Sequence, residues 1–207
     1  MSALERALPT GLGHLDELAA PLAALRAEAP RLEHWGRRLA EVLAGGGRLL
    51  AAGNGGSAAQ AAHLTSELVG RYRDDRPPFS AIALCAESSA VTAIGNDYGI
   101  EAIFARQVRA HGRPGDVLAV LSTSGRSANV LAAVEAAVEA GIATWALCGS
   151  HDCPLAEACD DAVCVESPHT ATVQEVHLIA IHLVCAAFDG ALERALPRVG
   201  AGAGALR

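Results

Sequence analysis

"GDVLAVLSTSGRSANVLAAVEAAVEAG", residues 115–141, joins an apolar run to a loop rich in hydroxyl groups and then to an amphipathic segment. The run at 116–122 predicts a buried β-strand, and apolar residues at three-and-four spacing over 127–140 predict a helix. A strand that leads directly into a helix is the repeating unit of a parallel sheet. This stretch therefore favours an α/β fold.

The same alternation extends in both directions along the chain. Runs typical of strands also lie at 48–52, 80–85, 143–148 and 162–166, and helical patterns lie at 57–70, 100–110 and 170–196. Residues 15–44 repeat apolar positions at helical spacing, but Pro21 and Pro30 interrupt them, which predicts two helices. We expect a doubly wound parallel sheet of five strands flanked by helices, with an N-terminal helical hairpin.

A length of 207 residues and a mass of 21.1 kDa fit one domain with a real core. We expect residues 1–47 to form a helical segment that packs on the domain and takes part in oligomerisation. The domain itself is expected at 48–196. The low-complexity end of the chain, 197–207, is predicted to be disordered.

Charge and composition exclude several classes of function. The net charge is -7 with no basic tract, which argues against a nucleic-acid surface. All sixteen basic residues are arginine, so Schiff-base chemistry, a pyridoxal enzyme and a P-loop with its lysine are excluded. The expected partner is a small molecule.

The six cysteines contain no C-x-x-C pair, and the chain opens without the pattern of a signal peptide, which predicts cytoplasmic thiols. The longest apolar stretch, "VHLIAIHLVCAAF" at 176–188, is too short to span a bilayer. No membrane partner is expected.

Ser122, Thr123, Ser124 and Ser127 surround Gly125 immediately before the helix predicted at 127–140. Hydroxyl groups and unpaired backbone N–H groups at a helix N-terminus bind anions without any cation. One of these serines would suffice as an N-cap, which is the simpler interpretation. Four hydroxyl residues in six positions favour a phosphate site.

"GNGGS" at 53–57 follows the first predicted strand in the same way. Its glycines allow a tight turn and close approach of a ligand to the backbone. It lacks the G-x-G-x-x-G spacing of a dinucleotide fold, and a plain strand-to-helix turn is an equal alternative.

A third group of candidates combines two helices. His63 and Glu67 are four residues apart and face the same way, whereas Gln174, His177 and His182 lie on the apolar helix at 170–196. Each histidine alone is typical of a satisfied core residue, but together with Glu67 they suggest a zinc-like site. Gln174 and His182 are roughly 12 Å apart along one helix, so either long side chains or neighbouring subunits complete such a site.

Four separated motifs, "GNGGSAAQAAHLTSELVGRYRDDRP", "AIGNDYG", "GDVLAVLSTSGRSANV" and "VQEVHLIAIH", resemble the sugar isomerase (SIS) domain family. Within it they are most similar to the phosphoheptose isomerases. The resemblance implies conversion of sedoheptulose 7-phosphate to D-glycero-D-manno-heptose 7-phosphate through an enediol, the first step of nucleotide-activated heptose biosynthesis. It also implies a cytoplasmic homotetramer with active sites at subunit interfaces.

By motif position, the resemblance implies one Zn²⁺ per subunit and specific residues around it. The implied metal ligands are His63, Glu67, Gln174 and His182, with Glu67 and His182 as the catalytic pair. The implied substrate contacts are Asn54, Gly55, Gly56, Glu67, Asn96, Asp97, Ser122, Thr123, Ser124, Ser127 and Gln174.

The chain departs from the family pattern at Gln60, where many relatives carry an acid, and at Thr172, where relatives often show arginine. His151 and Cys153 occupy a loop that tends to be glycine-rich in relatives. Three alternatives stay open: a non-catalytic SIS tetramer that binds a replication initiator, an isomerase of another sugar phosphate, and a sugar-phosphate sensor controlling transcription. No helix-turn-helix segment or basic patch supports the sensor.

Overall fold

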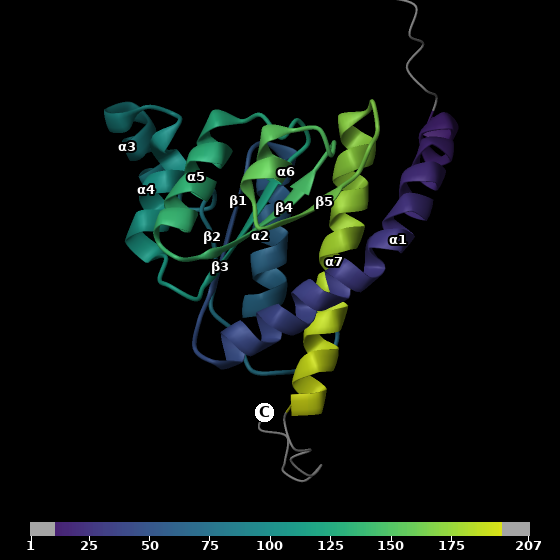
Figure 1. The fold of residues 1–207 in the computed structure, drawn as a ribbon, viewed down its shortest axis with the longest axis horizontal. Helices are drawn as coiled ribbons and strands as arrows, with labels where there is room; N and C mark the ends of the chain where they lie inside the picture. The colour runs from purple at the N-terminus through teal and green to yellow at the C-terminus, as the bar shows by residue number, and fades with distance from the viewer. Residues whose placement is uncertain (1–10, 196–207) are drawn as a thin grey trace, which may run out of the picture.

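A five-stranded parallel sheet lies at the centre of the computed structural model, which describes residues 11–195 (Figure 1). The sheet order is β2-β1-β3-β4-β5, and every neighbouring pair is parallel. The strands are β1 (Leu49–Gly53), β2 (Ala81–Ala83), β3 (Val117–Ser122), β4 (Ala143–Cys148) and β5 (Asp161–Cys164). The predicted doubly wound sheet is confirmed, and its strand order reverses between β1 and β3.

Helices cover both faces of the sheet. They are α1 (Gly11–Ala44), α2 (Gly56–Val69), α3 (Ser88–Tyr98), α4 (Ala102–His111), α5 (Ala128–Glu139), α6 (Pro154–Ala158) and α7 (Thr170–Ala195). One buried cluster joins the sheet to α1, α2 and α7, and a second joins it to α4, α5 and α6, with α3 at its margin. The sequence patterns did not predict α3, which buries no residue, or α6, which is only five residues long.

The predicted N-terminal helical hairpin is wrong, because α1 is one continuous helix with Pro21 and Pro30 inside it. Each proline removes a backbone hydrogen bond. Burial of an apolar stripe against α7 and the sheet offsets that loss, and Leu32 and Trp35 on this stripe are almost fully buried. Gly36 permits the closest approach, since a Cβ there would lie 2.5 Å from the Cβ of Ala187 on α7.

Helix α7 is longer than the apolar stretch in it suggested. Over Thr170–Arg194 it has the length and hydropathy of a membrane span, and half of the most apolar window is buried within the fold. Figure 1 shows α7 crossed by α1 and flanked by α2, the surroundings of a core helix. The predicted boundary after residue 47 stays a prediction, and the predicted tail at 197–207 lies outside the described residues.

Candidate functional site

Two loops meet where the strand order reverses, at the carboxyl ends of β1 and β3. Gly53 at the end of β1 is in register with Leu121 near the end of β3, so the loops that follow are neighbours. Open α/β sheets bind ligands in this position. The side-chain amides of Asn54 and Asn129 join the loops through two reciprocal hydrogen bonds, each 2.9 Å long.

The loop after β3, residues 122–127, gathers its hydroxyl groups in one place. The Oγ of Ser122 lies 3.5 Å from the Oγ of both Ser124 and Ser127, and it accepts a hydrogen bond of 3.1 Å from the backbone N–H of Gly125. Gly125 has a φ of 60°, a left-handed conformation that favours glycine. The loop thus presents three clustered hydroxyl groups at the start of α5.

Ser127 occupies the N-cap of α5, but its side chain makes no capping hydrogen bond among the described residues. The simpler interpretation of this serine as a cap therefore fails. Its hydroxyl remains available to a ligand, together with unpaired N–H groups in the first turn of the helix. This geometry suits a phosphate group, and we call residues 122–127 the phosphate loop.

The glycine turn at 54–56 begins α2 without a side-chain cap. Gly55 has a φ of 55°, which favours glycine. The side-chain amide of Gln174, from α7, lies directly over Gly56: a Cβ at this position would be 2.5 Å from Nε2 of Gln174. The turn is therefore shaped by close contact with α7, beyond what a plain strand-to-helix connection requires.

His63, Glu67 and His182 form a cluster between α2 and α7. Their candidate ligand atoms all lie within 4.8 Å of one another. The Nε2 atoms of the two histidines are 3.0 Å apart, and Nε2 of His63 is 3.4 Å from a carboxylate oxygen of Glu67. Tyr72 stacks on the ring of His182 with centroids 5.5 Å apart, which restricts that ring.

Two imidazole nitrogens and a carboxylate oxygen that converge in this way form a donor set suited to a divalent metal such as zinc. Zinc sites of the catalytic type use three protein ligands and leave a further position open. Gln174 lies eight residues before His182, roughly 12 Å along α7, with its amide over the glycine turn. Its predicted role as a ligand stays a prediction.

The remaining predicted contacts, Asn96 and Asp97, lie on α3. Both are exposed, and Nδ2 of Asn96 donates to the carboxylate of Asp97 at 2.8 Å. Helix α3 lies beside α4, on the other side of the sheet from α7 (Figure 1). Within one described chain these two residues are not brought to the His63–Glu67–His182 cluster.

The four residues that depart from the family pattern have distinct places. Gln60 donates its amide to the backbone carbonyl of Gln174, so it ties α2 to α7. Thr172 is fully buried, and its hydroxyl has no partner among the described residues. His151 is exposed. Cys153 is buried against the phosphate loop, where a Cβ on Gly125 would lie 2.2 Å from its Sγ.

No prediction from the sequence covered Asn129, and for His177 the sequence left open a satisfied core residue or a member of a zinc-like group. His177 is fully buried on α7, and its Nε2 donates to the carbonyl of Cys148 at 3.0 Å. Burial lowers the pKa of His177 from 6.5 to about 4, so the ring is neutral at pH 7. It holds α7 to the end of β4 and lies apart from the metal cluster.

Comparison with known proteins is consistent with this site. A family model described as the SIS domain matches residues 14–149. The phosphoheptose isomerase of Streptomyces coelicolor is 66% identical over 186 residues, which cover 90% of this chain and 80% of that protein.

Solved structures agree. The phosphoheptose isomerase of Neisseria gonorrhoeae matches with a TM-score of 0.79 and 38% identity, covering 86% of this chain and 97% of that one. The phosphoheptose isomerase of Francisella tularensis matches with a TM-score of 0.78 and 34% identity, covering 88% and 100%.

Proposed function

Since this chain belongs to the SIS domain family and its relatives are phosphoheptose isomerases, we propose that it converts sedoheptulose 7-phosphate to D-glycero-D-manno-heptose 7-phosphate. The reaction is an aldose–ketose isomerisation through an enediol. It would supply the first intermediate of nucleotide-activated heptose biosynthesis.

One observation carries the proposal: a phosphate-type loop and an acid/base cluster occur together in the same fold. The loop at 122–127 offers hydroxyl groups, and the cluster offers Glu67 beside two histidines. The glycine turn neighbours this loop, because Asn54 and Asn129 are joined by hydrogen bonds. It begins α2, on which His63 lies seven residues, about 10 Å, beyond Gly56. An extended seven-carbon sugar carries its phosphate and its carbonyl group at opposite ends and fits such a spacing.

The chemistry moves one proton between neighbouring carbons. The carboxylate of Glu67 would take the proton from C1 of the ketose and return it to C2. His182 would carry the proton that passes between the oxygens on C1 and C2. Tyr72, stacked on His182, would hold that ring in the required orientation.

His63, Glu67 and His182 would hold one Zn²⁺ per subunit, with Gln174 as a fourth ligand. Glu67 would alternate between the roles of ligand and base during turnover. The metal would polarise the sugar carbonyl as a Lewis acid. Because Gln174 lies roughly 12 Å from His182 along α7 and faces Gly56, we expect the fourth ligand of each site to come from a neighbouring subunit. Asn96 and Asp97, remote from the cluster in one chain, would also reach a neighbour's site in a homotetramer.

Charge and cysteine chemistry support the remaining expectations. All six cysteines are free thiols within the described residues, as expected for a cytoplasmic protein. The net charge of -7 argues against a nucleic-acid partner, and the burial of half of the most apolar window of α7 argues against a membrane partner.

The test is conversion of sedoheptulose 7-phosphate followed by proton NMR in deuterium oxide, with and without a chelator and added Zn²⁺. An aldose product with deuterium at C2, lost on chelation and restored by Zn²⁺, is the expected result. Turnover that persists after complete metal removal would refute the metal-dependent mechanism.

If the folded, zinc-loaded oligomer leaves sedoheptulose 7-phosphate unchanged, the proposed substrate is wrong. A panel of pentose and hexose phosphates then tests the isomerase of another sugar phosphate. Absence of turnover on the whole panel would favour the non-catalytic binding role.

A further inference from the structure

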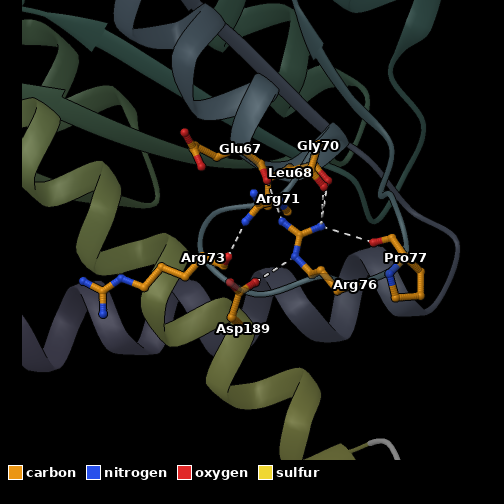
Figure 2. A network of polar contacts seen from close by, with 8 residues as sticks. All are labelled: Glu67, Leu68, Gly70, Arg71, Arg73, Arg76, Pro77 and Asp189. Carbon is orange, nitrogen blue, oxygen red and sulfur yellow. Dashed lines mark hydrogen bonds and ion pairs between the residues drawn. The ribbon is translucent and has the colours of Figure 1, made fainter. Parts of the chain in front are cut away.

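Arg76 lies in the loop between α2 and β2, and its side chain is only 9% exposed although it carries a full charge. A buried guanidinium is tolerated only where it is paired and hydrogen-bonded. Figure 2 shows its partners, which lie at the end of α2, on α7 and, at the carbonyl of Pro77, in its own loop.

The first partners are backbone carbonyls at the end of α2. Nη2 of Arg76 donates to the carbonyl of Glu67 at 2.6 Å, and Nη1 donates to the carbonyls of Leu68 at 3.0 Å and Gly70 at 3.4 Å. The last carbonyls of a helix lack intrahelical partners and favour a cation. Arg76 therefore binds the backbone of Glu67, whose side chain belongs to the metal cluster.

The second partner is Asp189 on α7. Nε of Arg76 donates to its carboxylate at 2.8 Å, and Asp189 lies seven residues, or two helical turns, beyond His182 on the same face of α7. The guanidinium also lies 5.2 Å from the ring of Phe188 and 5.6 Å from the ring of Phe79, and these rings contact each other edge to face. One cation thus joins the ends of α2 and α7.

We propose that Arg76, paired with Asp189, is a positioning residue that sets α2 against α7 so that His63 and Glu67 meet His182. The inference rests on the proposed function, because it gives Arg76 its role through the metal site. Arg76 touches no proposed ligand atom: it binds the carbonyl of Glu67 and leaves the carboxylate free.

Simple helix capping would require fewer contacts than the structure has. A cap needs only the carbonyls of α2, whereas Arg76 also binds α7 through Asp189. Partners that orient ligands at metal sites typically change metal affinity 10- to 100-fold when they are removed. Metal affinity is therefore the measurement that separates a positioning role from a purely structural one.

The experiment compares four variants of the full-length protein: Arg76→Met, Arg76→Lys, Asp189→Asn and Arg48→Met. Arg48→Met is the matched control, because Arg48 also donates to a backbone carbonyl, that of His111 at 3.0 Å, but lies directly before β1, away from the metal cluster. The dissociation constant for Zn²⁺ is measured by competition with a chromophoric chelator. The visible spectrum of the Co²⁺-loaded protein reports the ligand geometry, and circular dichroism shows that each variant is folded.

Arg76→Met is expected to weaken Zn²⁺ binding at least ~10-fold and to alter the Co²⁺ spectrum. Arg76→Lys keeps the charge but loses the planar fork, so it should restore only part of the affinity. Asp189→Asn should have a smaller effect in the same direction. Arg48→Met should lower the melting temperature and leave both metal readouts unchanged.

Wild-type metal affinity in folded Arg76→Met and Asp189→Asn would overturn the inference and leave the proposed function intact. If the wild-type protein itself binds no metal, the metal site and the role of Arg76 both fall. Should Arg76→Met fail to fold, Asp189→Asn decides the question, because it leaves the carbonyl contacts of Arg76 in place.

Discussion

The phosphate loop and the metal cluster are built in opposite ways. The loop takes its hydroxyl groups from six consecutive residues, 122–127, between one strand and one helix. The cluster joins His63 to His182 across 119 positions of sequence. The loop needs only local structure, whereas the cluster exists only if α2 and α7 pack correctly.

This difference predicts different responses to substitution. A change in the loop should weaken substrate binding and leave the rest of the site intact. A change in the cluster, or in the contacts between α2 and α7, should affect catalysis, metal binding and stability together. The following variants separate the two cases.

The largest effect is expected for Glu67→Gln, which removes the base and one metal ligand. The turnover number should fall by about 10³-fold, because general-base catalysis commonly contributes on that order. Glu33→Gln on the exposed face of α1 is the control and should keep wild-type activity. Retained turnover in folded Glu67→Gln, measured by the NMR assay, would remove Glu67 from its proposed role.

The second effect concerns the contact between α7 and the end of β4, where His177 donates to the carbonyl of Cys148. The pKa of His177 is about 4 when the protein is folded and near 6.5 when it is unfolded, so the unfolded chain binds more protons between these values. Neutral His177 therefore contributes about 3 kcal/mol to the free energy of unfolding above pH 6.5. This contribution is lost as the pH falls toward 4.

Urea unfolding of the wild type and of His177→Asn between pH 4 and 7 measures this contribution. The variant should be less stable at pH 7 and should lose less stability than the wild type as the pH falls. Parallel pH profiles for the two proteins would contradict the assignment.

The third effect is expected at the glycine turn, where Gly56 contacts the side chain of Gln174 on α7. In Gly56→Ala the new Cβ would collide with the amide of Gln174, so either the turn or the amide must move. Because either movement displaces groups that position the substrate, kcat/KM should fall roughly 10- to 100-fold. Gly190→Ala is the matched control, because its Cβ would meet only the flexible side chain of Arg194, at an ordinary contact distance of 3.6 Å. Equal activity of the two variants would show that Gln174 is not part of the site.

The smallest effect is expected within the loop itself. Ser127→Ala removes one hydroxyl from the phosphate site and should raise KM about 10-fold with little change in the turnover number, the usual size for one hydrogen bond to a charged group. Ser80→Ala, an exposed serine directly before β2 and at the opposite end of the parallel strands from this loop, serves as the control. A large fall in the turnover number with unchanged KM would place Ser127 at the reacting carbons instead.

Much of the fold could be predicted because the strands and longer helices carry strong periodic patterns. The five strands were predicted to within a few residues, and α2, α4, α5 and α7 were found. Helix α3 could not be found, because it buries no residue and so has no apolar stripe. The continuity of α1 was missed because its prolines are tolerated only through packing against α7.

For the site, the phosphate loop, the glycine turn and the members of the metal cluster could be predicted from the sequence. Asn129, Arg76 and Asp189 could not, because their partners are distant in sequence. An asparagine in the first turn of a helix after a phosphate-type loop was a weak signal. Nothing local to Arg76 distinguishes it from the neighbouring Arg71 and Arg73, which are exposed.

The sequence by itself determined the parallel α/β architecture and the hydroxyl-rich loop after β3, and it predicted a small anionic ligand for that loop, because strand-to-helix units and helix N-termini are local features. Only the tertiary structure decided which polar residues of α2 and α7 meet, that His177 lies apart from the metal cluster, and that Arg76 joins the two helices. The reason is physical: contacts between helices depend on how their faces pack, and no periodicity within either helix specifies its partner.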